Sequence, residues 1–255
     1  MSATIDLARI AETLDEAAIA VEPIAQTGET LDVVQAYEAQ RLGIVRRETR
    51  GERRIGIKMG LTSRAKMAQV GIDEVIWGRL TDGMIVEEGG SLERARFIHP
   101  RAEPEIAFRL RAPLEGIVTE MEAWEAVDCI APAIEILDSR YRDFKFNLGD
   151  AIADNCSSAG LVVGPWQPRE TDISNLGMAM DINGRPVALG SSAAILGHPI
   201  RTLTAAARLM ARHGDRLQPG DIFLSGAPTA AVPLVAGMRV RLRVENLGAC
   251  AFSVV

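Results

Sequence analysis

The 255-residue sequence is poor in the residues that most often build metal clusters and covalent cross-links, with only three cysteines and three histidines. Cys129, Cys156 and Cys250 lie far apart and form no Cys-X-X-Cys motif, and the histidines are equally scattered. An odd number of widely spaced cysteines favours reduced thiols over a disulfide framework, and this spacing does not match a zinc site. The sequence therefore predicts a protein of a reducing compartment, the cytoplasm.

Long hydrophobic runs and an excess of positive charge are also missing. No uninterrupted apolar stretch is long enough to cross a bilayer, and residues 1–6 lack the basic and apolar regions of a signal peptide. The formal net charge of -6 argues against nucleic acid or an anionic membrane as the main partner. The sequence contains no Walker loop, no Gly-X-Gly-X-X-Gly and no Gly-X-Ser-X-Gly, so these common cofactor and nucleophile motifs do not explain its function.

The first part of the chain has a helical pattern. Apolar residues recur at helical spacing over residues 5–18 and again over 31–45, with Gly28 between the two segments and Gly51 after them. We therefore assign residues 1–52 to an N-terminal helical segment.

The rest of the chain, residues 53–255, has the pattern of a β-rich catalytic domain. Residues 55–61 are short and apolar, with glycines where another group could approach closely. Five segments are predicted to be strands, namely residues 105–110, 129–137, 221–225, 239–244 and 249–254. Asn183-Gly184 is typical of a hairpin turn, and residues 200–213 form a predicted amphipathic helix. Because strands and helices do not alternate regularly, the sequence predicts an α+β fold with a mixed, β-rich core.

Three glutamates are the strongest chemical signal in the sequence. Glu103 and Glu105 would share one face of a strand, because side chains alternate with a period of two. Glu135 lies between Ile134 and Ile136 in a stretch that reads as buried, where an ionised carboxylate must be paired or bound to a metal. Three converging carboxylates would suit a hard divalent cation, Mg²⁺ or Mn²⁺. The spacing alone equally fits two exposed strand carboxylates and one ion-paired glutamate.

Other polar residues could serve the same site or have only a structural role. Lys58, within an apolar segment, could orient a substrate or carry a proton, or it could place its ammonium group in water. Arg140 could bind a carboxylate in a bidentate manner or form a structural ion pair. Ser157 belongs to a small polar turn that could line a pocket, while Cys156 has no sequence-local base to make it a nucleophile.

Several motifs in fixed order resemble the hydratase/decarboxylase family of meta-cleavage pathways, within the fumarylacetoacetate-hydrolase-like superfamily. The resemblance runs from about residue 30 to the C-terminus and rests on Lys58-Met59-Gly60-Leu61-Thr62-Ser63, Pro100-Arg101-Ala102-Glu103-Pro104-Glu105-Ile106-Ala107, Pro132-Ala133-Ile134-Glu135-Ile136, Ala153-Asp154-Asn155-Cys156-Ser157 and Ile195-Leu196-Gly197-His198-Pro199. It implies a mixed β-rich core of the fumarylacetoacetate-hydrolase type.

The resemblance also implies roles for individual residues. The Mg²⁺ or Mn²⁺ ligands of the family map onto Glu103, Glu105 and Glu135, and its active-site lysine maps onto Lys58. The implied substrate-binding residues are Lys58, Leu61, Ile76, Trp77, Arg140 and Ser157.

Two sister activities are known for this family, and this chain departs from the hydratases at one position, while the segments at residues 101–105 and 138–141 look more like the decarboxylases. Hydratases of 2-oxopent-4-enoate (2-hydroxypentadienoate) carry an aspartate just before an aromatic-glycine pair. In this chain Ile76 precedes Trp77-Gly78, so the resemblance favours decarboxylation of 4-oxalocrotonate (2-oxo-3-hexenedioate), with hydration as the alternative.

The resemblance further implies a 2-oxo dicarboxylate substrate, a homo-oligomer and a possible complex with the sister hydratase. A non-catalytic partner of that hydratase is the alternative from another class, although a pure scaffold has no physical reason to keep three glutamates and Lys58 together. A C–C hydrolase of the wider superfamily would need a Glu-His base near the N-terminus, where the first histidine of this chain is His99.

Overall fold

The computed structural model describes residues 5–26, 28, 30–63, 67 and 74–255. The helices are α1 (Leu7–Ala20), α2 (Val33–Thr49), α4 (Glu120–Glu125), α5 (Leu148–Ala153) and α6 (Ile200–Arg212), with short 3-10 turns η1 (Asp82–Met84), η2 (Arg94–Arg96), η3 (Arg142–Phe144), η4 (Asn155–Ser157) and η5 (Ser192–Ala194). The strands are β1 (Arg54–Gly60), β2 (Ile76–Thr81), β3 (Ser91–Leu92), β4 (Arg101–Leu110), β5 (Val127–Leu137), β6 (Ser158–Val163), β7 (Gln167–Pro168), β8 (Gly177–Ile182), β9 (Arg185–Ser191), β10 (Ile222–Leu224), β11 (Val232–Pro233), β12 (Arg239–Val244) and β13 (Gly248–Val254).

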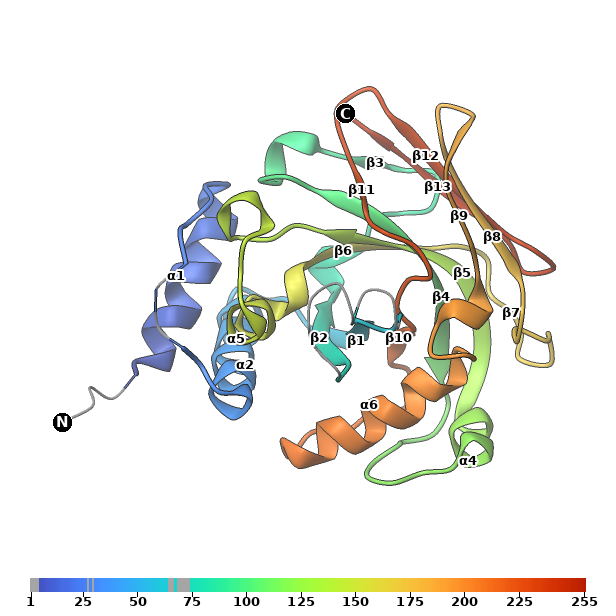
Figure 1. Ribbon diagram of the computed structural model, residues 1–255, viewed down its shortest axis with the longest axis horizontal. Coiled ribbons are helices and arrows are strands. Elements are labelled where there is room, and N and C mark those ends of the chain that lie inside the picture. Colours follow the sequence, from blue (N-terminus) through green and yellow to red (C-terminus); the bar gives the residue numbers. More distant parts are fainter. Residues whose placement is uncertain (1–4, 27, 29, 64–66, 68–73) are drawn as a thin grey trace.

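The larger sheet is strongly curled and forms the centre of the molecule (Figure 1). Its strands follow the order β2-β1-β10-β4-β5-β6, with β11 added to β4 and β7 added to β5. The two ends of the sheet approach each other closely. The amide of Val86, just after β2 and η1, donates a hydrogen bond to the carbonyl of Leu161 in β6. Small and aliphatic side chains fill the concave face, among them Leu80, Ala107, Ala131, Ala133, Leu161 and Leu224.

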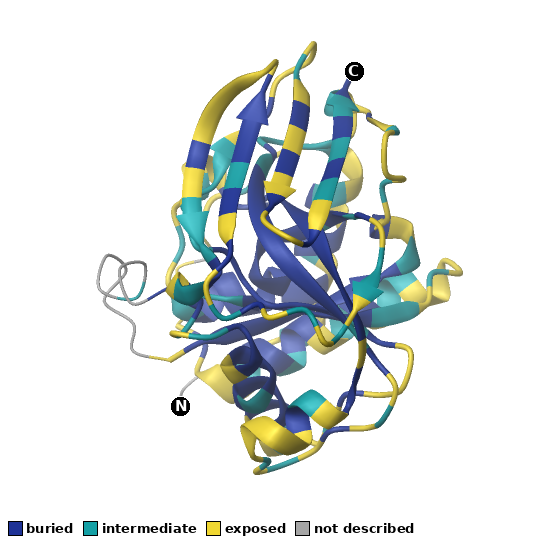
Figure 2. Ribbon diagram, turned by 90° about the vertical axis from the view of Figure 1, so that its right-hand side faces the viewer, coloured by how far each residue is buried: buried dark blue, intermediate teal, exposed yellow. Residues whose placement is uncertain are grey.

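The smaller sheet has the order β3-β13-β12-β8-β9 and packs against the first sheet through β12 and β13 (Figure 1). In β12, exposed arginines at 239, 241 and 243 alternate with buried Val240, Leu242 and Val244. Figure 2 shows this alternation as stripes along the strands, with one face in the core and one in solvent.

Helices α1 and α2 lie side by side next to the curled sheet, with α5 packed on α2 (Figure 1). Asp32 caps α2 in a complete capping box with Gln35, so the start of this helix is determined locally. The apolar side chains of Ile10 and Leu14 in α1 belong to the same hydrophobic cluster as the strands. The boundary at residue 52 therefore remains a prediction about domain organisation.

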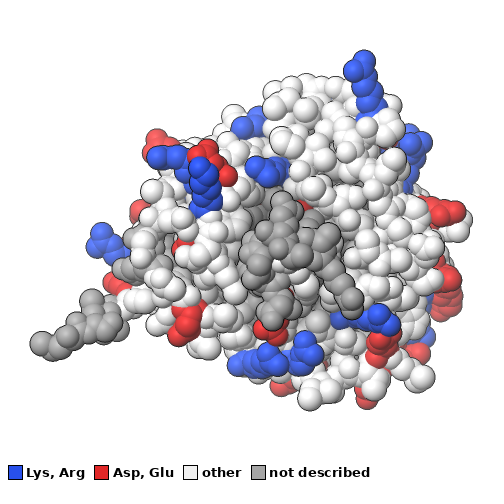
Figure 3. Space-filling view, viewed as in Figure 1, with Lys and Arg blue, Asp and Glu red and all other residues white. Residues whose placement is uncertain are grey.

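The predicted α+β class and the N-terminal helices are confirmed. The predicted strands and the Asn-Gly hairpin between β8 and β9 are also present, and a capping box of Thr119 and Glu122 begins α4. Among the described residues, no helix is both long and apolar enough to span a bilayer. On the face shown in Figure 3, positive and negative side chains are interspersed over the described surface.

Candidate metal centre and active site

The register between β4 and β5 brings the three glutamates together. Glu103 is paired directly with Glu135, and Glu105 follows two residues later on the same face of the curled sheet. One carboxylate oxygen from each of the three lies within 4.8 Å of the others. Glu105 is 0% and Glu135 1% exposed, while Glu103 is 9% exposed. The convergence predicted from the sequence is therefore present.

The three carboxylates repel one another strongly in this buried position. Burial, the neighbouring charge of Glu135 and that of Glu103 raise the pKa of Glu105 well above its usual value, although Lys58 opposes them. Burial likewise raises the pKa of Glu135, against the opposing charge of Lys58. One oxygen of Glu105 accepts a hydrogen bond from the amide of Gly226 at 2.6 Å, but its Oε1 has no such partner among the described residues.

Lys58 completes the cluster from β1. Its side chain is 3% exposed, and its Nζ lies 2.9 Å from Oε1 and 3.2 Å from Oε2 of Glu135, the second contact having hydrogen-bond geometry. Burial lowers the pKa of Lys58, but the charge and hydrogen bond of Glu135 together with the neighbouring Cys156 and Glu105 outweigh burial, and the net shift is upward. The lysine is thus a buried ammonium held by a carboxylate, and not a solvated lysine.

The donor set fits a hard divalent cation. Three close carboxylates offer oxygen ligands only, which Mg²⁺ and Mn²⁺ prefer, whereas zinc sites usually contain nitrogen or sulfur. The bare Oε1 of Glu105 and the mutual repulsion of the glutamates are both relieved when a cation lies between them.

Ile76 and Leu61 lie close to this centre at the end of the β1–β2 pair. Lys58 is paired with Gly78, and Gly60 with Ile76, so Lys58 and Ile76 are on the same face of the sheet. Leu61 follows β1 directly and has a left-handed backbone with φ of 57°. An apolar side chain therefore stands where the hydratases are expected to carry a carboxylate.

Ser157 belongs to a turn of unusual backbone conformation. Asn155, Cys156 and Ser157 all have positive φ values, between 49° and 58°, which is uncommon for residues with a side chain. The Asn155 carboxamide accepts from the amide of Arg79 at 2.7 Å and donates to its carbonyl at 2.8 Å, so the turn is tied to β2. The Cys156 thiol points at the carbonyl of Trp77, which places Ser157 next to the strand pair that carries Lys58.

Trp77 faces away from the glutamates. It is paired with Met59, one residue from the Lys58–Gly78 pair, and its ring stacks on Tyr37 of α2 with 4.9 Å between the centroids. Because neighbouring strand residues point to opposite faces, its indole packs under the helices. The expectation that Trp77 binds substrate is not supported by this placement.

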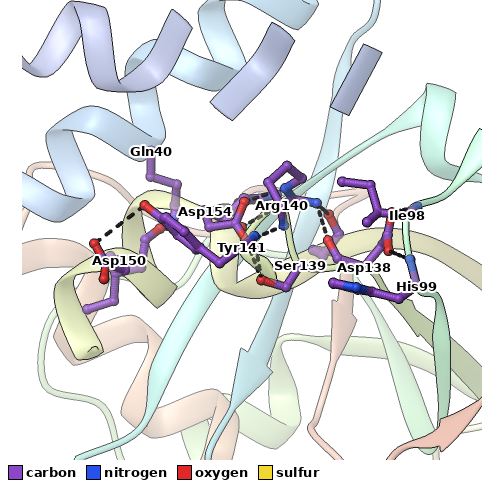
Figure 4. Close-up of polar contacts among 12 residues, drawn as sticks. Gln40, Ile98, His99, Asp138, Ser139, Arg140, Tyr141, Asp150 and Asp154 are labelled. Atoms are coloured by element: carbon purple, nitrogen blue, oxygen red, sulfur yellow. Dashed lines mark hydrogen bonds and ion pairs between the residues drawn. The ribbon is translucent and has the colours of Figure 1, made fainter. Parts of the chain in front are cut away.

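Arg140 is engaged in a structural ion pair, as Figure 4 shows. Its guanidinium group donates to the carboxylate and the backbone carbonyl of Asp154, and also to the carbonyl of Asp138. Both charged side chains are buried, with Arg140 8% and Asp154 1% exposed. These contacts use the N–H donors that a substrate carboxylate would need. A structural ion pair therefore describes Arg140 better than a contact with substrate.

Gly226 was missed by sequence reasoning. Its amide holds Glu105, and its φ of +88° and its surroundings leave no space for a side chain, since a Cβ would lie 2.1 Å from Thr62 Oγ1. A glycine directly after the predicted strand at 221–225 is a weak signal for such a close approach.

The chain matches known proteins over nearly its whole length. Residues 68–255 match the family described as fumarylacetoacetate (FAA) hydrolase C-terminal. A 4-oxalocrotonate decarboxylase from Pseudomonas sp is 57% identical over 97% of each chain. A 2-hydroxyhexa-2,4-dienoate hydratase from Comamonas testosteroni is 35% identical over 89% of this chain and 88% of its own.

A solved structure agrees with these sequence matches. The 4-oxalocrotonate decarboxylase from Pseudomonas putida G7, complexed with magnesium and adipate, has a TM-score of 0.95 and 35% identity, and the match covers 99% of both chains. The fold predicted from the family resemblance is therefore confirmed. The chain belongs to the fumarylacetoacetate hydrolase family, within its hydratase/decarboxylase group.

Proposed function

We propose that the protein is a carboxy-lyase, a 4-oxalocrotonate decarboxylase that converts 2-oxo-3-hexenedioate into 2-hydroxypenta-2,4-dienoate (2-oxopent-4-enoate) and CO₂ in the meta-cleavage of aromatic compounds. The observation that carries the proposal is the 57% identity to a protein of that name across almost the entire chain. The hydratase relatives reach 35 to 37% identity. The buried cluster of three glutamates and one lysine supplies a site suited to this chemistry.

Glu103, Glu105 and Glu135 would hold a divalent cation, Mg²⁺ or Mn²⁺, and Gly226 would keep Glu105 in place. When bound, such a cation supplies positive charge that offsets the negative charge growing on the 2-keto oxygen of the substrate. The carboxylates themselves stay ionised in this role, because their charges are then balanced.

The reaction breaks the bond between the distal carboxylate and its neighbouring carbon. The electron pair of this bond moves through the former C3–C4 double bond onto the 2-keto oxygen, which takes up a proton, and CO₂ leaves. Lys58 is buried and positively charged beside Glu135, so its ammonium group can orient the 2-oxo acid end or donate a hydrogen bond to the developing enolate oxygen. Leu61 and Ser157 border the same end of the site in this proposal.

Ile76 separates this proposal from the sister reaction. Addition of water requires a group that orients or activates that water, and the carboxylate expected at this position in a hydratase is replaced by an apolar side chain that is 8% exposed. The apolar side chain of Ile76 also makes the charged distal carboxylate of the substrate less favourable relative to neutral CO₂. The same side chain therefore supports decarboxylation and argues against hydration.

Three further points belong to the proposal. The product of the decarboxylase is the substrate of the sister hydratase, which makes a complex between the two enzymes chemically reasonable. We also propose a homo-oligomer, as the family resemblance implies. The three cysteines are buried and free, which suits a cytoplasmic location.

Replacing one metal ligand tests the role of the glutamates. Glu135→Gln should still fold, but its Mg²⁺ affinity should fall by at least the roughly 10–100-fold known for changes next to metal ligands, and CO₂ release should fall with it. The exposed Glu87→Gln on the connection after β2 is the matched control and should behave as wild type. Full turnover by Glu135→Gln with added Mg²⁺ would show that Glu135 is not an essential ligand.

A further inference from the structure

Among the described residues, the charged groups of the metal centre provide no partner for the second carboxylate of the proposed substrate. Three glutamates, the Lys58 ammonium and one divalent cation sum to zero net charge. The substrate of the proposed function carries two carboxylates, and only the one beside the 2-keto group is near the cation. Desolvating the distal carboxylate without a partner would be unfavourable, and Arg140 is already bound to Asp154.

Arg101 lies on the same strand and the same face as the metal centre. It begins β4, two residues before Glu103 and four before Glu105, in a register with β5 that is unbroken across these positions. Exposure rises along this face, from 0% at Glu105 through 9% at Glu103 to the partly exposed Arg101. The strand therefore leads outward from the glutamates to Arg101. A strand advances about 7 Å for every two residues along its axis.

The guanidinium group of Arg101 is held in a way that leaves its donors free. Its central carbon lies 3.9 Å from the ring centroid of Phe144, so the group is stacked on the ring. Stacking uses the face of a guanidinium and leaves the N–H groups at its edge available for a bidentate contact with a carboxylate. Among the described side chains, no carboxylate forms an ion pair with Arg101.

We propose that Arg101, positioned by Phe144, binds the distal carboxylate of the dicarboxylate substrate and makes the enzyme specific for diacids. This inference rests on the proposed function and names the residue that recognises the second acid group. The distal carboxylate keeps part of its charge until the C–C bond has broken, so the contact stabilises the bound substrate and, more weakly, the transition state. Loss of Arg101 should therefore raise KM and lower kcat/KM for the diacid without lowering kcat.

A matched pair of ligands isolates this contact. 2-Oxoadipate and 2-oxohexanoate share the 2-oxo acid end and differ only in the distal carboxylate, and calorimetry with the Mg²⁺-loaded protein gives the affinity of each. Arg101→Gln should weaken 2-oxoadipate binding about tenfold or more, equivalent to at least about 1.4 kcal/mol, and leave 2-oxohexanoate binding unchanged. Arg101→Lys should keep part of the preference, because the charge remains.

Arg109→Gln is the matched control, since Arg109 is on the same strand and pairs with Asp128 at the surface. The proposal is overturned when Arg101→Gln weakens both ligands equally, when it weakens neither, or when wild-type protein does not prefer the diacid. In turnover assays, Arg101→Gln should raise KM and leave kcat undiminished. Failure of the proposed function would look different, because wild-type protein would then release no CO₂ while its preference for the diacid could still be measured.

Discussion

At the residue scale, each charged side chain of the site would be unfavourable if it were buried alone. Together the side chains are acceptable, because their charges offset one another. Glu105 and Glu135 are almost completely buried, and each has its pKa raised chiefly by burial. Lys58 neutralises one negative charge, and a divalent cation balances the other two. The apolar Ile76 stands at the edge of this polar centre, on the same face as Lys58.

We expect Ile76→Asp to slow CO₂ release. The new carboxylate would make the pocket polar and repel the distal carboxylate, while Ile76→Val should stay close to wild type because it keeps the wall apolar. The kcat for CO₂ release from 2-oxo-3-hexenedioate is the measurement for all three proteins. An unchanged kcat in Ile76→Asp would refute the role of the apolar wall.

The shared face of Glu103 and Glu105 and the burial of Glu135 could be predicted from alternation along a strand and from the apolar neighbours of Glu135. Their role as a metal site and the role of Lys58 were implied only by the family resemblance, because the local pattern around Lys58 also fits an ammonium group in water. The environments of Trp77 and Arg140 could not be predicted from the sequence. Which face Trp77 occupies depends on the register of β1 with β2, and the partner of Arg140 is Asp154, fourteen residues away. Sequence patterns say little about such pairings.

At the element scale, long and strongly patterned segments were predictable and short ones were not. The helices α1 and α6 and the strands β12 and β13 have clear periodicity, and β4 and β5 are long, mostly apolar segments. Strands β7 and β11 contain two residues each, and β2 is buried at every position, so none of these shows a usable alternation. Their pairing depends on the curled sheet as a whole.

The packing of α1 on α2 contains a charge cluster whose contribution depends on pH. Asp15 of α1 accepts hydrogen bonds from Arg46 at 2.9 Å and from Arg50 at 2.6 and 2.7 Å. Burial alone would raise the pKa of Asp15, but the hydrogen bonds and charges of Arg50 and Arg46 outweigh it, and the net pKa is lowered.

We expect Asp15→Asn to lower the free energy of unfolding at pH 7 by about 1 kcal/mol, a modest value because both arginines are partly exposed to solvent. A carboxylate with a lowered pKa in the folded state stabilises the protein above its unfolded-state pKa, and this contribution disappears as the pH falls through the folded-state value. Urea denaturation of Asp15→Asn, wild type and the exposed control Glu16→Gln between pH 7 and pH 3 measures this. A difference that stays constant down to pH 3 would contradict the ion-pair explanation.

At the scale of the whole molecule, the curled sheet gathers distant parts of the sequence into one site. Residues from β1, β2, β4 and β5, and from the turn before β6, meet on or beside its concave face. The cation site therefore exists only in the folded chain, and metal binding must stabilise the fold.

We expect Mg²⁺ to raise the melting temperature of metal-stripped protein. At a concentration 100-fold above Kd the gain is about 2.7 kcal/mol, or roughly 5–10 °C for a chain of this size. Glu135→Gln should show a much smaller shift, and KCl of equal ionic strength serves as the control for charge screening. An equal shift with KCl would mean that the effect is not specific binding.

The most direct test of the account is a paired assay on purified protein with and without Mg²⁺. CO₂ release from 2-oxo-3-hexenedioate and water addition to 2-hydroxypenta-2,4-dienoate are followed separately. We expect CO₂ release that stops on chelation and returns with Mg²⁺, and no hydration. Hydration without CO₂ release would assign the chain to the sister activity, and CO₂ release that survives chelation would contradict the role of the glutamate triad.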